Sequence, residues 1–87
     1  MPSRESVKVI VLTTGLLLIA EVEEVTSELG GPDCKLKEPY VVNERDTVEP
    51  WLLNVTNQNE MMISSDKILT LVEPKTPLLA AYEKVFE

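Results

Sequence analysis

Two short apolar segments separated by four polar residues lie late in this chain and limit what it can fold into. Residues 60–63 (Glu-Met-Met-Ile) and 68–72 (Ile-Leu-Thr-Leu-Val) have the length and composition of β-strands, and residues 64–67 (Ser-Ser-Asp-Lys) lie between them. Apolar runs bounded by polar turn residues are typical of consecutive strands. The pattern therefore predicts two strands joined by a tight loop in a small all-β domain.

Alternating apolar and polar residues predict three further strands nearer the N-terminus. Gly15 supplies a turn after the first of them, and the turn formers of residues 28–33 predict a loop before the third. Pro39 cannot donate a ladder hydrogen bond, so we expect the third strand to be bent, bulged or unpaired on one side there. The three strands are expected at Val7–Thr13, Leu16–Val25 and Cys34–Val42.

The segment between the third and fourth strands is long and polar. Residues 43–50 predict an acidic loop. We interpret residues 51–53 (Trp-Leu-Leu) as part of an extended loop anchored by Trp51, with a separate short strand as the alternative.

A helix of about three turns is predicted at residues 77–86. Thr76 can cap the free amides of the first turn, and Pro77 suits the first helical position. The helix would be marginal alone, so its apolar side should dock over an open end of the barrel or on the outer surface of the second strand. That side is made by Leu78, Leu79, Tyr82, Val85 and Phe86.

The length of 87 residues fits one domain, at a size where self-association becomes attractive. We expect residues 1–6 to be a flexible lead, residues 7–87 to form the domain, and the barrel to occupy about residues 7–72. The formal charge of −7 repels phosphate, so sequence-independent binding to nucleic acid is disfavoured.

The chain has no histidine and one cysteine, Cys34. These counts exclude an internal disulfide, the usual zinc ligand sets and any Ser-His or Cys-His nucleophile. We therefore expect no catalytic residues, metal or cofactor, and a reducing, cytoplasmic compartment. Residues 7–20 are too short and too interrupted, at Thr13-Thr14-Gly15, for a membrane span, and no signal cleavage site follows them.

Two stretches resemble the signatures of the Sm/LSm family. Gly15, the apolar residues 16–19, Ala20 and Val22 match the spacing of the first signature, with Ala20 in place of a second glycine. Residues 63–71 match the strand, loop and strand of the second signature. The resemblance implies a strongly bent, five-stranded open barrel, here with a C-terminal helix. It also implies a homo-oligomeric ring, in which the fourth strand of one subunit pairs with the fifth strand of the next.

The chain departs from the family at the residues that contact RNA. Ser64-Ser65 stands where the family has Arg-Gly, and Thr26 and Gly30 stand where it has Asp and Asn. These departures indicate a divergent member, such as a phage-encoded one. The resemblance implies RNA contacts at Ser64, Ser65, Asp66 and Lys67, and subunit contacts at Met61, Met62, Ile63, Ile68, Leu69 and Leu71.

Each candidate feature also has a plain structural interpretation. The 64–67 loop is then a solvated hairpin turn, Cys34 is buried, and Tyr40 belongs to the core. The acidic residues Glu21, Glu23, Glu24 and Glu28 fit a solvated strand face better than a cation site.

Two hypotheses of function remain open. The first is an Sm-like ring that binds single-stranded RNA weakly or selectively, in RNA processing or regulation. The second is a ring-shaped scaffold that binds a protein partner and no nucleic acid. Neither involves a membrane.

Overall fold

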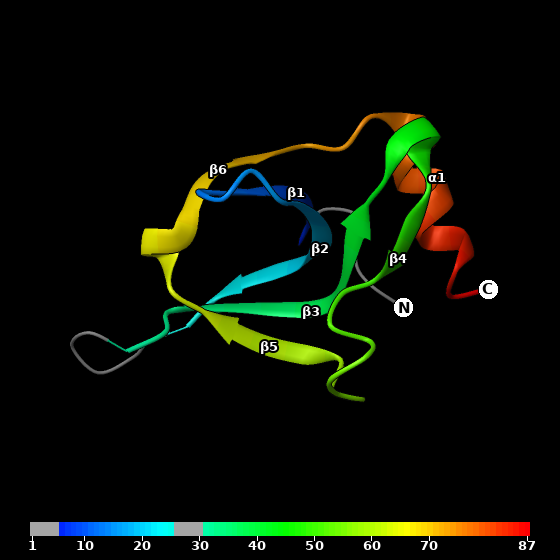
Figure 1. Ribbon diagram of the computed structural model, residues 1–87. Helices are drawn as coiled ribbons and strands as arrows, with labels where there is room; N and C mark the ends of the chain where they lie inside the picture. The colour runs from blue at the N-terminus through cyan, green and yellow to red at the C-terminus, as the bar shows by residue number, and fades with distance from the viewer. Residues whose placement is uncertain (1–5, 26–30) are drawn as a thin grey trace.

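A computed structural model describes residues 6–25 and 31–87 and shows one bent antiparallel sheet with a C-terminal helix (Figure 1). The prediction of a mainly β fold with this helix is confirmed. The sheet is open and has six strands rather than five. Three expectations fall wholly or partly outside the described residues: most of the flexible lead, the first half of the 28–33 loop, and the comparison of Thr26 and Gly30 with the Sm signature.

The strand boundaries follow the sequence pattern closely, because alternating β-branched and aliphatic residues suit a pleated, half-buried strand. The third, fourth and fifth predicted strands begin and end where the pattern placed them, and the first two are shorter by one or two residues. The strands are β1 (Val7–Leu12), β2 (Leu17–Glu24), β3 (Cys34–Val42), β4 (Val48–Pro50), β5 (Glu60–Ile63) and β6 (Ile68–Val72).

The extra strand, β4, lies in the segment predicted as an acidic loop. The 3-10 turn η2 (Glu44–Asp46) reverses the chain after β3, and β4 then pairs with the end of β3. Residues 51–55 form turns rather than a strand, so the loop interpretation of Trp51 is confirmed. Trp51 is half-buried and packs against the inner core.

The strands follow the order β4-β3-β2-β1-β6, and β5 pairs with the other half of the same edge of β3. β5 and β6 are consecutive in the chain, yet they pair with different strands at opposite ends of the sheet. The interpretation of residues 64–67 as a hairpin turn was therefore wrong. It rested on sequence proximity, whereas β1 and β3 supply the actual partners.

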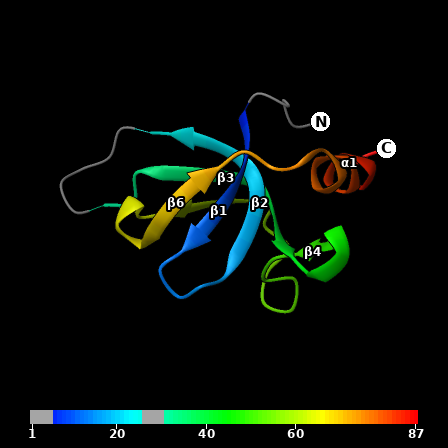
Figure 2. The same ribbon diagram turned by 90° about the horizontal axis from the view of Figure 1, so that it is seen from above.

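This arrangement forces the sheet to curl. Ile63 lies level with Glu24 at one end of β2, whereas Ile68 lies level with Leu12 near the other end. In a flat sheet these two corners would be about 30 Å apart, from strand spacing and rise per residue. The short connection between them reaches at most about 18 Å even when extended. Figures 1 and 2 show the resulting bend, and in Figure 1 β6 and β5 lie on opposite sides of it.

Curling gives the sheet two apolar faces, each with its own core. The inner core contains Ile10, Leu18, Ala20 and Leu36, all fully buried. The outer core lies beneath α1 (Thr76–Lys84), which is at one end of the molecule (Figure 2). Residues of α1 share this core with residues of β1 and β2. The buried members of the outer core are Val7, Val9, Ile19, Leu78 and Tyr82. Of the two docking places expected for the helix, the outer face of the sheet fits, although the contacts of the helix extend beyond β2 to β1 and β3.

Two details of the helix differ from prediction. The cap position is Lys75, without a side-chain cap bond, so Thr76 is the first helical residue rather than the cap. Val85 remains 44% exposed, whereas the other four residues of the predicted stripe pack on the sheet. The helix ends at Lys84, so Val85 and Phe86 both follow it, and of these two only Phe86 packs against the core.

Tyr82 is the anchor of the outer core. Its side chain is fully buried, and its hydroxyl donates a hydrogen bond of 2.8 Å to the backbone carbonyl of Glu38 on β3. Burial raises the pKa of Tyr82, so the hydroxyl remains a neutral donor at physiological pH. Its ring also meets Tyr40 and Phe86 edge to face, at centroid distances of 5.7 and 5.1 Å.

Substitution of Tyr82 by Phe should lower the free energy of unfolding by about 1 kcal/mol, because the ring contacts remain while the Glu38 carbonyl loses its donor. Leu78→Ala should cost about 2–5 kcal/mol by opening a cavity. Val85→Ala, the control, should change stability by less than about 0.5 kcal/mol because Val85 is exposed. Thermal melts at one fixed protein concentration measure all three. Equally small losses of stability in Leu78→Ala and Val85→Ala would show that packing of the helix on the sheet contributes little to stability.

Candidate functional site

The sheet ends in β6 on one side and in β4 and β5 on the other, and the open edges of β5 and β6 are the first candidate site. In the part of the chain that the structure describes, β6 pairs only with β1, and β5 pairs only with β3. Each strand therefore leaves one row of backbone N–H and C=O groups open to another chain. Such edges are templates for strand addition unless charges, proline or a covering segment protect them.

The edge at β6 is interrupted by a bulge at Leu69, which has no partner on β1, but it lacks the charges and prolines that protect most edge strands. Residues 68–72 contain no charge and no proline. Leu69, Leu71 and Val72 are 69%, 43% and 45% exposed, so both faces of the strand present apolar side chains to solvent. Ile68 is half-buried against the inner core. An apolar strand exposed in this way has the chemistry of surfaces that contact other protein chains.

The edge at β5 is smaller and more mixed. Met62 is 43% exposed, whereas Met61 is buried and Ile63 is half-buried against the inner core. Of the residues predicted for subunit contact, Met62, Leu69 and Leu71 thus have side chains available to a partner. Met61 is already covered by its own chain, and Ile63 and Ile68 are partly covered.

The β5–β6 turn (residues 64–67) holds the predicted RNA contacts, and the structure gives it a bridging role. On one side, the backbone N–H of Thr13 donates to the carbonyl of Lys67 at 2.9 Å. On the other, Ser65 donates to Asp33 twice, from its backbone N–H at 2.7 Å and from its hydroxyl at 2.8 Å. Thr13 follows β1 and Asp33 precedes β3, so the turn ties together two distant corners of the sheet.

These hydrogen bonds use the groups that were expected to face RNA. The Ser65 hydroxyl donates to Asp33, and the Ser64 hydroxyl accepts from the backbone N–H of Asp66 at 3.4 Å. Asp33, bound to Ser65, and Asp66 give the turn two carboxylates against the single exposed lysine Lys67. The turn is therefore a weak site for phosphate, although Lys67 and the turn backbone remain accessible.

Asp33 was not identified from the sequence. It lies 32 residues before its partner Ser65, and its sequence context is that of an ordinary turn residue. The two hydrogen bonds from Ser65 hold the pKa of the Asp33 carboxyl below its usual value of 3.8. The two hydrogen bonds from the turn thus favour the charged form of the Asp33 carboxylate.

The remaining candidate residues have structural surroundings. Cys34 is buried, as predicted, and burial raises the pKa of its thiol, with Asp33 and Glu24 adding to the effect. Within the acidic run, Glu23 forms an exposed ion pair with Lys37 on β3 at 3.4 Å, which fits a solvated strand face. Glu28 lies outside the described residues.

Two broader findings concern metals and membranes. Across residues 6–25 and 31–87, no three Asp, Glu or Cys side chains gather into a group that could hold a metal ion. Within the same residues, no helix has the length and apolar character needed to cross a bilayer.

Together these features define a small, mainly β protein with a curled open sheet and two unlike free edges. Residues 5–87 match the family described as "Family of unknown function (DUF6561)". The match spans nearly the whole chain, so the protein belongs to this family. No curated protein matches the chain. The resemblance to Sm/LSm proteins stays a prediction.

Replacing Asp33 by Asn should reduce the pH dependence of the free energy of unfolding at acid pH. Because the folded-state pKa of Asp33 lies below the unfolded value, its carboxylate stabilises the fold above about pH 4 and loses this effect as the pH falls further. The variant should melt at a lower temperature than the parent at neutral pH, and the difference should shrink towards pH 2–3. Asp46→Asn, which removes an equal charge from the exposed η2 turn, is the control. A constant difference at every pH would contradict the assignment.

Proposed function

We propose that this protein is a non-enzymatic scaffold that assembles head to tail, with β6 of one copy adding to β5 of the next. The observation that carries the proposal is the exposed, uncharged apolar strand β6, which has a partner on one side only among the described residues. Left uncovered, such an edge is an aggregation hazard, so a stable protein needs an occupant for it.

A second copy of the chain is the occupant that the fold supports best. β5 offers an open edge of similar length in every copy, and Met62 gives it an adaptable apolar side chain beside that edge. β5 and β6 are different surfaces, so the contact is heterologous and generates a ring when the rotation between subunits closes. The Sm/LSm resemblance favours closure into a ring.

The wider setting forms part of the same proposal. A single buried cysteine suits a reducing, cytoplasmic compartment. With no histidine in the chain, the commonest general base is missing, and we expect no catalytic activity.

Substitution of Leu69 by Lys should dissociate the assembly, weakening association by at least about tenfold, because an ammonium group would be buried without a partner. Leu69 is 69% exposed, so the fold of the single subunit should be unaffected. Val55→Lys is the matched control, since Val55 is 75% exposed and belongs to neither β5 nor β6. Light scattering across micromolar concentrations should give a discrete multiple of the subunit mass for the parent and control, and the subunit mass for Leu69→Lys. A parent that is monomeric throughout would refute the proposal.

Binding of single-stranded RNA at the β5–β6 turn is the second candidate function. It is favoured by the exposed Lys67 and by the position of this turn in the Sm/LSm resemblance. The neighbouring carboxylates and the net charge of −7 weigh against it.

If RNA binds there, Lys67→Glu should weaken binding to all sequences, because Lys67 is the only cation of the turn. Lys75→Glu makes the same charge change beside α1 and should have a smaller effect. Fluorescence anisotropy with short U-rich and A-rich oligonucleotides at low and moderate salt measures both variants. Absence of binding at low salt would refute RNA binding and leave the scaffold as the one remaining proposal.

A further inference from the structure

A second feature lies between β4 and the start of β5, where β3 is bulged. Ile19 pairs with Tyr40 and Glu21 pairs with Lys37, so Glu38 and Pro39 together lie opposite the single residue Ala20. The expectation of a bulge near Pro39 is thus confirmed. Glu38 adopts a left-handed conformation, with φ of 53°, which is unfavourable for a residue with a side chain. Bulges of this kind often re-aim a side chain next to a binding site.

Three hydrogen bonds hold Glu38 in this conformation. Its backbone N–H donates to the carbonyl of Asn59 at 2.7 Å, and its carbonyl accepts from the Tyr82 hydroxyl at 2.8 Å. The side-chain amide of Asn59 also donates to one carboxylate oxygen of Glu38 at 2.9 Å. The strained residue is therefore fixed from both the helix side and the loop side, which is how strain is retained at functional positions.

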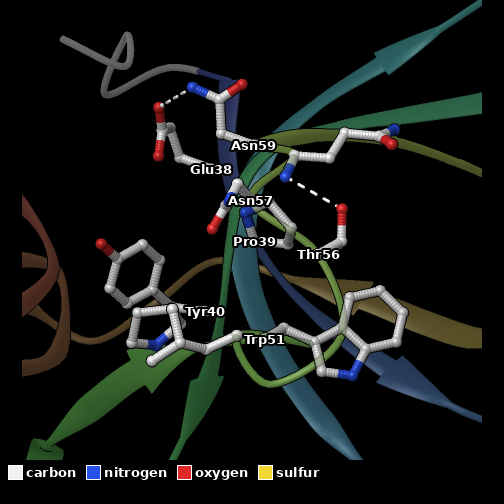
Figure 3. A pocket seen from close by; sticks show the side chains of 10 residues that line it. Glu38, Pro39, Tyr40, Trp51, Thr56, Asn57 and Asn59 are labelled. Atoms are coloured by element: carbon white, nitrogen blue, oxygen red, sulfur yellow. Dashed lines mark hydrogen bonds between the residues drawn. The ribbon is translucent and has the colours of Figure 1, made fainter.

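Glu38 lines a pocket between the bulge and the loop of residues 51–59. Figure 3 shows Glu38 and Asn59 on one side of it and Trp51 and Tyr40 on the other. The loop is held against β3 by the backbone N–H of Trp51, which donates to the carbonyl of Pro39 at 3.0 Å. The volume is about 150 Å³. Sites for drug-sized ligands have about 300–1,000 Å³, so this pocket has room for a single side chain or a similar small group.

The chemistry of the pocket selects a cation with an apolar stem. Asn59 occupies one carboxylate oxygen of Glu38, and among the described residues no lysine or arginine pairs with the carboxylate. Pro39, Pro50 and Trp51 supply apolar walls. Lysine and arginine side chains combine a hydrocarbon stem with a charged head and match both parts. The net charge of −7 adds a general attraction for a basic partner.

A neighbouring hollow extends the surface. Its volume is about 490 Å³, it shares Pro50 and Leu53 with the pocket, and Leu52 and Val55 contribute further apolar lining. Leu53 and Val55 are 61% and 75% exposed. Leu52 also has a left-handed conformation, with φ of 61°. An apolar residue next to the cation in a bound peptide would lie over this hollow.

We propose that the Glu38 pocket binds one Lys or Arg side chain from a basic segment of another protein, with an adjacent apolar residue of that segment in the neighbouring hollow. The site uses neither β5 nor β6. It is therefore complete within one subunit, and the basic segment would be a binding partner of the proposed scaffold.

Trp51 is the only tryptophan in the chain and lines the pocket, so its fluorescence reports occupancy directly. The full-length protein is titrated with acetylated, amidated dipeptides Arg-Leu, Lys-Leu, norleucine-Leu and Glu-Leu. We expect a saturable change with the first two that weakens with added salt, and none with the last two. Equal responses to the Arg-Leu and norleucine-Leu peptides, or no response to any peptide, would overturn the proposal.

Variants then assign the effect to the pocket. Glu38→Gln should weaken binding of the Arg-Leu peptide about tenfold, since it removes the charge while Gln can still accept from Asn59. Glu44→Gln removes an equal charge from the exposed η2 turn and should bind like the parent. Amide shifts of the parent protein on binding should concentrate in residues 38–40 and 50–59, and shifts centred on β6 would refute the site.

The two proposals can fail separately. Leu69→Lys should lose assembly and keep peptide binding, because Leu69 lies on the opposite end strand of the sheet. Loss of both properties in a folded Leu69→Lys protein would show that the pocket depends on assembly, which contradicts a site complete within one subunit.

Discussion

The β5–β6 turn is the constraint on which the rest of this structure depends. Only four residues join strands that belong to opposite ends of one sheet, so the sheet must curl until its distant corners meet. Hydrogen bonds from Thr13 and to Asp33 fix the turn at both corners. The curl then encloses the inner core, leaves β5 and β6 as free edges, and exposes an outer apolar face that α1 covers. The turn residues predicted to contact RNA thus stabilise the curled sheet.

The outer core couples the helix to the middle of the sheet. Tyr82 reaches from α1 to the carbonyl of Glu38, at the point where the bulge interrupts the ladder between β2 and β3. Without that donor, the strained residue would lose one of the three bonds that fix it. The helix is therefore more than a cover for apolar surface, because it sets the backbone at the mouth of the pocket on the far side of β3.

The local pattern of apolar and polar residues predicted most of the strands and the helix, but it did not predict which strands pair. The bounds of β3, β5 and β6 could be predicted because polar residues flank the apolar segments. Asp33 precedes β3, Ser64 follows β5 and Glu73 follows β6. β4 could not, because Val48-Glu49-Pro50 has no alternation of its own and is a strand only through its pairing with β3. The hairpin interpretation failed because adjacency in sequence suggests pairing, whereas β1 and β3 offered both strands other partners. Asp33 and the Glu38 pocket depend on contacts across more than 20 residues, which spacing alone does not reveal.

If copies assemble head to tail as proposed, the unlike edges have a consequence for mixtures of intact and altered copies. In a symmetric dimer, a damaged face removes the damaged copy from assembly and leaves the intact copies to pair with one another. In a head-to-tail chain, a copy damaged on β6 alone still offers an intact β5, so it joins a growing chain and terminates it. A minority of such copies would block closure for the majority. In a cell that makes both forms, a change at a single edge would therefore behave as dominant.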